Sequence, residues 1–452
     1  MAHTLGLDRL ERHPGRTIVA VGVLFAVAYV SAVTLFPRAH GRIIDGDGIQ
    51  YYAYLRSLVF DRDVNFVNDY ELLYGADTDN VWLTNRTVTG YAVNQMSIGP
   101  ALLWLPVFLL TCGLVAAGTL LGSSVPVDGF AAPFQLSAGL AGIVYSTAGV
   151  YLLYRICARE FAPRPALWAS LVAWLASPAI YYSLVSPTYS HALSMFTVAL
   201  FVDVWRRTRG ESGPRRYVVL GLLAGLAALV RWQDVIIMLL PVGEAVAKRP
   251  TRVTQAVGRL ALMGGVSAVA FAPQMMAWRA MYGRFVLTPQ GSDFMRWTEP
   301  QIAAVLWSWN HGLFSWTPAL LLAVGGLYWL HRHDRLLGWG SAVVVLIAVY
   351  INASVVDWWG GEAFGARRFV SYTVFFALGL TAIASTERLR RQAYAVRLVA
   401  AFLIASNVLF LAQYQIAMRS GGEIVEYPVT ARQVLWERFA LPWRLVGRQA
   451  LE

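Results

Sequence analysis

Two carboxylates bracketed by glycines stand in the run Asp45-Gly46-Asp47-Gly48, just beyond the first apolar stretch of the chain. A carboxylate within hydrogen-bond reach of an acceptor hydroxyl can take its proton, which is the work of a general base. The two acids could also share a hard divalent cation such as Mg²⁺ or Mn²⁺ through their oxygens. Glycine lets the backbone bend tightly and approach a ligand closely. Asp47 and Asp45 are therefore the candidate catalytic residues.

A structural role for the same turn stays open. Asp47 could cap a short helix predicted over residues 49–60, because an aspartate oxygen accepts from the free N–H groups of a first helical turn. Capping needs one acid and this turn has two, which favours a catalytic role for the turn. Asp61 and Asp63 follow the predicted helix and face no obvious partner, so they are interpreted as part of a solvated turn.

Three arginines are candidates for holding a phosphate group. Arg231 lies inside an apolar stretch, where a charge is costly and usually faces a cavity or a partner. A pair with Asp234, three residues on, is the structural alternative. Arg367 and Arg368 lie at a predicted external helix start, where guanidinium groups can grip phosphate oxygens bidentately. Their alternative is to extend toward the membrane interface.

Other polar and aromatic residues are suited to a sugar ring. His311 stands in Trp309-Asn310-His311-Gly312, and Glu362 follows a tryptophan-rich and glycine-rich run. Tryptophan and tyrosine belts at a membrane interface explain the aromatic residues equally well. His191, at another predicted external helix start, is interpreted as a polar cap or as a histidine whose hydrogen bonds are satisfied within the protein.

Composition defines the class of protein. Hydrophobic residues make up 57% of the 452 residues, charged residues make up 14%, and the mean hydropathy is +0.51. Such a chain is too apolar for a soluble globule. Its apolar runs are long enough to cross a hydrocarbon core of about 30 Å. The sequence therefore predicts an all-α polytopic membrane protein of roughly 11 to 13 crossings.

The basic residues set the expected orientation. They cluster at the ends of apolar runs, which under the positive-inside rule places the N-terminus in the cytoplasm. The net charge of +11 therefore comes from basic residues that anchor the ends of helices, and it does not indicate a nucleic-acid partner. We expect one transmembrane domain over residues 1–452. Its external parts are residues 37–96, 283–315, 353–369 and the tail 419–452.

One segment does not fit a simple alternation. Residues 97–121 are apolar and long enough to cross, but a single crossing would put the arginines at 155–164 on the wrong side. Either Pro106 breaks the segment into a re-entrant or paired element, or the loop around Asp128 is cytoplasmic and the arginine rule fails there.

The first predicted external loop contains five short motifs, namely Gly46-Asp47-Gly48, Tyr51-Tyr52, Leu55-Arg56-Ser57-Leu58, Asp61-Arg62-Asp63 and Asn68-Asp69-Tyr70. With these motifs the loop resembles the first external loop of the GT-C fold glycosyltransferases. These membrane enzymes use polyprenyl-phosphate sugars and include the protein O-mannosyltransferases and the lipid A aminoarabinose transferase. This chain is most similar to a less characterised bacterial branch.

The resemblance implies a GT-C-type fold with short juxtamembrane helices in the first external loop. It also implies an inner-membrane enzyme that moves a sugar from a polyprenyl-phosphate donor to a lipid, glycan or protein acceptor on the extracytoplasmic side. The family's acidic residue falls on Asp47, with Asp45 as the nearest substitute, and Tyr51 and Tyr52 fall beside it. Phosphate is a good leaving group, so one base suffices and inversion is expected.

A polytopic transporter or lipid flippase is the alternative from another class. It would explain Arg231, Asp234 and the hydrophobicity equally well. It would not explain the long acidic loop that follows the first predicted helix.

Overall fold

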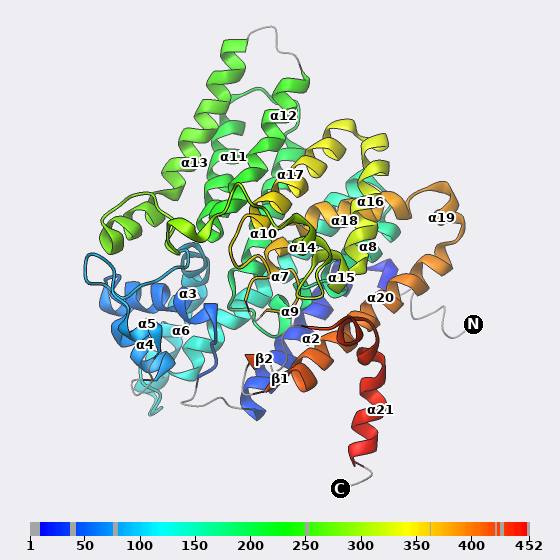
Figure 1. The fold of residues 1–452 in the computed structure, drawn as a ribbon. Helices are drawn as coiled ribbons and strands as arrows, with labels where there is room; N and C mark the ends of the chain where they lie inside the picture. The colour runs from blue at the N-terminus through cyan, green and yellow to red at the C-terminus, as the bar shows by residue number, and fades with distance from the viewer. Residues whose placement is uncertain are drawn as a thin grey trace. The chain divides into compact units, whose positions relative to one another are not determined.

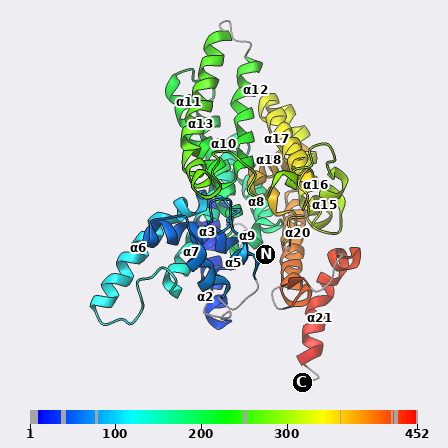
Figure 2. The same ribbon diagram turned by 60° about the vertical axis from the view of Figure 1, so that its left-hand side comes forward.

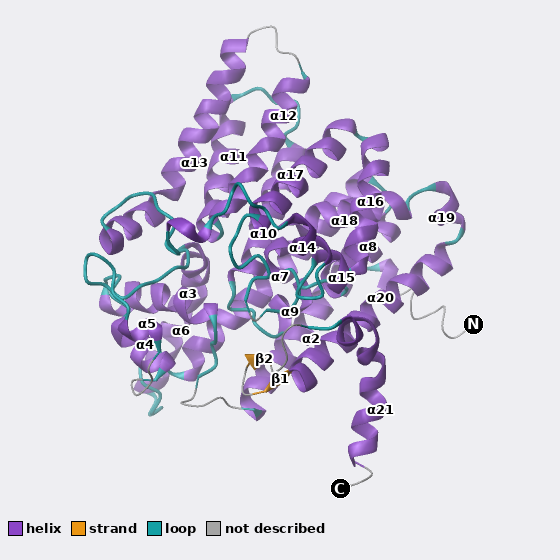
Figure 3. Cartoon of the chain, in the orientation of Figure 1, coloured by secondary structure: helices purple, strands orange, loops and turns teal. Residues whose placement is uncertain are grey.

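The computed structural model describes residues 10–36, 42–75, 80–248, 253–361, 363–420, 423–424 and 429–449. Helices dominate these residues (Figure 3). Their named strands are β1 (Arg419–Ser420) and β2 (Glu423–Ile424), which pair antiparallel. The expectation of an all-α protein is confirmed.

Six helices of the described residues are long and apolar enough to cross a membrane, which identifies a multi-pass membrane protein. The predicted total of roughly 11 to 13 crossings also requires shorter helices and stays a prediction. The six membrane-length helices are Pro14–Leu35, Gly99–Leu120, Ala132–Glu160, Val253–Tyr282, Arg335–Ala353 and Ala393–Ile416.

The chain divides into two compact units. Unit 1 comprises Met1–Ile18, Val150–Tyr181 and Asp293–Glu452, and unit 2 comprises Val19–Gly149 and Tyr182–Ser292. A few helices contribute residues to both units: α2 (Pro14–Leu35), α7 (Ala132–Glu160), α9 (Ala179–Leu184) and the short η4 (Ser292–Phe294).

Unit 2 contains the first predicted external loop and a group of long helices (Figure 1). Its helices are α3 (Asp47–Arg56), η2 (Ser57–Asp61), α4 (Val67–Tyr74), α5 (Val81–Thr84), α6 (Gly99–Leu120), α10 (Ser190–Arg207), α11 (Pro214–Val230), η3 (Trp232–Met238), α12 (Leu239–Ala247) and α13 (Val253–Tyr282). The short α3 and η2 together agree with the helix predicted over residues 49–60.

Helices α11 and α13 lie side by side because glycines bring their backbones together. A Cβ atom added at Gly221 would lie 2.6 Å from the Met263 carbonyl oxygen, and one at Gly225 would lie 2.7 Å from the Ser267 carbonyl oxygen. Small residues at such positions give the close helix packing typical of membrane proteins. Arg231 follows the last residue of α11.

Helix α6 is continuous through Pro106. The interpretation that Pro106 breaks this segment is therefore wrong. Proline removes one backbone donor, but membrane helices tolerate the loss because local adjustments satisfy the freed carbonyl. Figure 2 shows α6 and the loop after it extending away from α3.

Both ends of the α6 segment return to helix α3. Before α6, Asn94 donates its side-chain amide to the Gln50 carbonyl at 2.9 Å, and after α6 the Asp128 carbonyl accepts from Arg56 Nε at 3.1 Å. The 10 residues of α3 rise only about 15 Å, half the thickness of a hydrocarbon core. The residues before and after α6 therefore lie close together along α3, although α6 itself is long enough to cross.

Unit 1 contains the remaining helices, among which α16 packs against α18 and α17, and α8 packs against α18 and α20. They are α8 (Pro163–Leu175), α14 (Ile302–Trp307), α15 (Leu313–Trp316), α16 (Pro318–His333), α17 (Arg335–Ala353), η5 (Arg367–Tyr372), α18 (Thr373–Ala384), α19 (Glu387–Arg391), α20 (Ala393–Gln413), η6 (Tyr414–Met418), η7 (Gln433–Glu437) and α21 (Arg438–Gln449).

A buried carboxylate ties the amino-terminal segment of unit 1 to two of its helices. Glu11 is 8% exposed, accepts from Trp168 Nε1 at 2.8 Å and pairs with Arg397 Nε at 2.8 Å. A buried charge is stable only when it is paired and hydrogen-bonded, as Glu11 is. The contacts hold residues before α2 against α8 and α20.

Candidate active site

The acidic turn lies at the start of α3. The helix begins at Asp47, and Gly46 occupies the N-cap position with φ of +50°. Asp47 is thus the first residue of the helix and not its cap, so the capping interpretation is wrong. A carboxylate in a first turn is favoured by the positive end of the helix dipole. Asp45 and Asp47 are both partly exposed, as a general base must be to meet a substrate.

The turn packs against the polar segment that precedes α10. A Cβ atom added at Gly48 would lie 2.6 Å from Thr188 Oγ1, and one at Gly46 would collide with the Tyr189 hydroxyl. A side chain at either position would force the turn or the Thr188 and Tyr189 side chains to shift. The two glycines therefore place Asp47 beside the start of α10.

The hydroxyl of Ser190 links helix α3 to Arg231. Tyr51, one turn into α3, donates its hydroxyl to Ser190 Oγ at 2.8 Å. Arg231 donates from Nη1 to the same oxygen at 3.2 Å. Tyr51 is 5% exposed, so it acts as a support for this arrangement. The structure thus brings Arg231, which is distant in the sequence, to Tyr51, one helical turn after Asp47 in α3.

The side chain of Arg231 contacts His191 and Gln233, and not Asp234, the partner that the sequence suggested. Its Nη1 lies 3.2 Å from His191 Nδ1, and the side-chain oxygen of Gln233, in its satisfied orientation, accepts from Nε at 3.1 Å and Nη2 at 2.6 Å. Within the described residues Arg231 and Asp234 form no ion pair, and Asp234 accepts from Ser194. The guanidinium is therefore held by neutral groups, which leaves its charge uncompensated by them.

Tyr52 belongs to the core of unit 2. It is fully buried, and its hydroxyl donates to the Gly129 carbonyl at 2.6 Å. Its ring meets Phe108 of α6 edge-on, with ring centroids 5.9 Å apart. A side chain without exposed surface does not contact a substrate, so the assignment of Tyr52 to substrate binding is wrong.

A second group of acids surrounds Arg56 at the other end of α3. Arg56 pairs with Asp61, and its Nη1 lies 3.7 Å from Oδ1 of the fully buried Asp69. Burial raises the pKa of Asp69 to about 7, with Arg56 opposing the shift and Asp61 and Asp63 adding to it. Asp61 also accepts from Asn68 at 2.9 Å, so the interpretation of a merely solvated turn does not hold for it.

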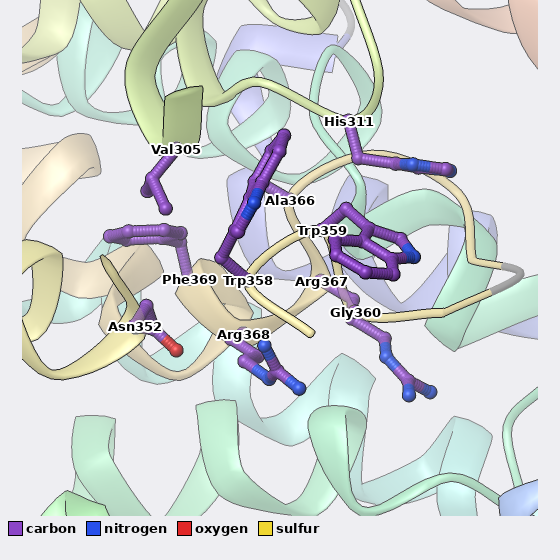
Figure 4. A pocket seen from close by; sticks show the side chains of 10 residues that line it. All are labelled: Val305, His311, Asn352, Trp358, Trp359, Gly360, Ala366, Arg367, Arg368 and Phe369. Atoms are coloured by element: carbon purple, nitrogen blue, oxygen red, sulfur yellow. The ribbon is translucent and has the colours of Figure 1, made fainter. Parts of the chain in front are cut away.

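Arg367, Arg368 and His311 come together in unit 1, where they line one pocket (Figure 4). Both guanidinium groups extend to the same side of the loop, below Trp358 and Trp359. Arg368 binds Asp357 through its carboxylate at 2.7 Å and its carbonyl at 2.8 Å. The cavity measures about 10 Å³, which is room for about one water. A sugar would require the pocket to widen.

His311 is neutral in this pocket. Burial, assisted by the charge of Arg367, lowers the pKa of His311 to about 3 against an opposing contact with the Ala363 backbone. Its Nδ1 lies 2.8 Å from Asn310 Oδ1, and its ring stacks on Trp316. Glu362, the remaining candidate of this loop, lies outside the described residues.

Metal binding by Asp45 and Asp47 stays a prediction. No group of three or more histidine, cysteine, aspartate or glutamate side chains that could hold a metal ion occurs among the described residues. A cation at the turn would therefore take its other ligands from water or from a substrate, as Mg²⁺ commonly does.

No family model matches this sequence. No curated protein matches it either. Among solved structures, the chain is similar to archaeal oligosaccharyltransferase AglB from Archaeoglobus fulgidus, solved in complex with an inhibitory peptide and a dolichol-phosphate. The two share 13% sequence identity over 91% of this chain, with a TM-score of 0.47, and the match spans 61% of the length of AglB. A similarity this low assigns the chain to no family.

Sequence reasoning missed the residues around the start of α10 as the common support of the site. The run Thr188-Tyr189-Ser190-His191 contacts the acidic turn, Tyr51 and Arg231. Its signal was a row of polar and aromatic residues between two apolar stretches. His191, interpreted from the sequence as a polar cap or a satisfied histidine, is a direct neighbour of Arg231.

Proposed function

We propose that this protein is a membrane glycosyltransferase that transfers a sugar from a polyprenyl-phosphate donor to an acceptor on the extracytoplasmic face, with inversion. The observation that carries the proposal is the meeting of the α3 turn and Arg231 on Ser190 and its neighbours. A carboxylate and a guanidinium near the same segment of unit 2 support the proposal, because the chemistry needs a base and a phosphate-binding cation.

In the proposed reaction, Asp47 takes the proton of the acceptor hydroxyl as its oxygen attacks the anomeric carbon. The new bond forms between that oxygen and the anomeric carbon while the bond from the carbon to the phosphate oxygen breaks. Polyprenyl phosphate leaves with the bonding electrons. Arg231 stabilises the phosphate through charge-assisted hydrogen bonds, which are about twice as strong as neutral ones.

The neutral surroundings of Arg231 support this role. Ser190, His191 and Gln233 orient the guanidinium without cancelling its charge. An arginine that served only the fold would be expected to pair with a nearby carboxylate such as Asp234. A transporter or flippase could also use an oriented arginine, but it needs no base at the start of α3.

The proposal is tested by mass spectrometry of cell-envelope glycans from cells with and without the gene, and from cells that express an Asp47→Asn variant. Loss of the same sugar from one envelope component in both mutant strains is expected. An unaltered glycan profile with undiminished protein levels would reject the transferase. A lipid that accumulates on the cytoplasmic side without loss of a sugar would indicate a flippase.

A further inference from the structure

Unit 1 contains an apolar cavity of about 310 Å³ that is separate from the pocket lined by His311, Arg367 and Arg368. Side chains of α8, α16, α18, α19 and α20 line it. Gln392 is the one lining residue that has a side-chain amide. The indole N–H of Trp168, which also lines the cavity, is already bonded to Glu11. The walls therefore offer almost nothing to water, and a cavity lined by apolar groups stays dry unless an apolar ligand fills it.

The cavity opens at the outer surface of the helix bundle. Leu322 on α16 is 46% exposed and Val399 on α20 is 52% exposed, and both are part of its wall. Helix α20 is one of the membrane-length helices. The opening therefore lies where hydrocarbon chains of the bilayer surround the protein, so a lipid chain can enter sideways.

Positive charge marks one end of the cavity. Leu389 of α19 lines it, and the exposed Arg388 and Arg390 flank that leucine. Neither arginine forms an ion pair with a described residue, whereas the neighbouring Arg391 pairs with Glu387. Helix α20 begins at Ala393 without a side-chain cap, so the positive end of its dipole adds to the charge.

We propose that this cavity binds an acyl chain of an anionic glycerophospholipid, whose phosphate group is held by Arg388 and Arg390. An apolar chain slot that ends at unpaired arginines matches the two parts of such a lipid. Basic pockets between transmembrane helices on the cytoplasmic side bind anionic headgroups in this way. The arginines of α19 belong to the clusters that the positive-inside rule places in the cytoplasm.

The test uses purified protein in mild detergent, incubated with an equimolar mixture of phosphatidylglycerol and phosphatidylcholine that carry the same acyl chains. Retained lipid is measured by native mass spectrometry. The unmodified protein should retain phosphatidylglycerol in at least about tenfold excess, which corresponds to one decade in the equilibrium constant. Equal retention of the two lipids would overturn the assignment of an anionic headgroup.

Two kinds of variant separate the chain slot from the headgroup site. Ala395→Phe and, from the opposite wall, Leu322→Trp should each reduce retention of both lipids, while Val408→Phe, exposed on α20 outside the cavity, should not. Monodisperse elution of each variant shows that it is folded. If both filled variants are folded and keep the lipid, the cavity is not its site.

The charge variant removes only the preference for the anionic lipid. Arg388→Gln combined with Arg390→Gln should bring retention of phosphatidylglycerol down to that of phosphatidylcholine. Arg332→Gln combined with Arg335→Gln, a matched pair of exposed arginines in the same unit, should leave the preference unchanged. A preference that survives the first pair, or is lost with the second, would overturn the proposal.

Discussion

Arg231 and His191 lie side by side, with guanidinium Nη1 3.2 Å from imidazole Nδ1. Arginine has donors only, so His191 must accept at Nδ1 and carry its proton on Nε2. The histidine is therefore neutral in this contact, and it directs the guanidinium without competing for a phosphate. This contact joins the end of α11 to the start of α10, beside the acidic turn of α3.

The first prediction concerns the base. Asp47→Asn should leave the protein folded, because an amide is tolerated in a first helical turn, and should reduce turnover by about 10² to 10⁴, the usual contribution of a general base. Transfer from a polyprenyl-phosphate sugar is the measurement. Asp45→Asn is the matched control and should retain most activity. If the two variants exchange these results, the base is Asp45, and activity in both would exclude the turn as the catalytic centre.

The second prediction concerns the phosphate. Arg231→Lys keeps the charge but loses the planar fork, so donor affinity should fall by about tenfold, the effect of one charge-assisted hydrogen bond. Arg215→Lys, an exposed substitution on the same helix, should have no effect. Equilibrium binding of a polyprenyl-phosphate donor is the measurement. Unchanged affinity of the Arg231 variant would remove this residue from the site.

The third prediction concerns Arg368 of the unit 1 pocket. Arg368 is engaged by Asp357, so Arg368→Gln should lower the free energy of unfolding by about 1 to 3 kcal/mol, the cost of removing a hydrogen-bonded charge. Arg335→Gln, an exposed control in the same unit, should stay within about 0.5 kcal/mol. Thermal unfolding in detergent provides the comparison. A fully stable Arg368 variant would show that this ion pair does not support the fold.

The fourth prediction follows from the raised pKa of Asp69, which is about 7 against the ordinary 3.8. Between these pH values the folded protein binds more protons at this site than the unfolded chain, so this residue makes stability fall as pH rises from about 4 to about 7. Asp69→Asn should remove that part of the fall and be more stable than the native protein at pH 7.5. Glu71→Gln, an exposed substitution on the same helix, should leave both the pH dependence and the stability at pH 7.5 unchanged. Parallel melting curves of native protein and Asp69→Asn at every pH would contradict the assignment.

The fifth prediction concerns the path of α6. In a chain whose two native cysteines are replaced by alanine, Val127→Cys should react with an impermeant maleimide in intact cells, as should Asn65→Cys in the first loop. Glu211→Cys, in a predicted cytoplasmic loop, should react only after permeabilisation. Reaction of the Val127 variant only after permeabilisation would mean that α6 crosses the membrane.

The sequence alone determined the class of the protein. Apolar runs of membrane length can bury their backbone only as helices in a bilayer, so composition was enough to predict an all-α polytopic chain. The glycines around Asp47 were enough to indicate a close approach, because few other residues allow one.

Only the tertiary structure decided which residues meet. Tyr51, Ser190 and Arg231 are joined by contacts across distant parts of the chain, and no local periodicity reports such contacts. The same limit explains the wrong substrate role for Tyr52, since a tyrosine in a polar loop gives no sign of whether it faces water or the core. It also explains why the predicted break at Pro106 was wrong, because the environment of a helix decides whether proline ends it.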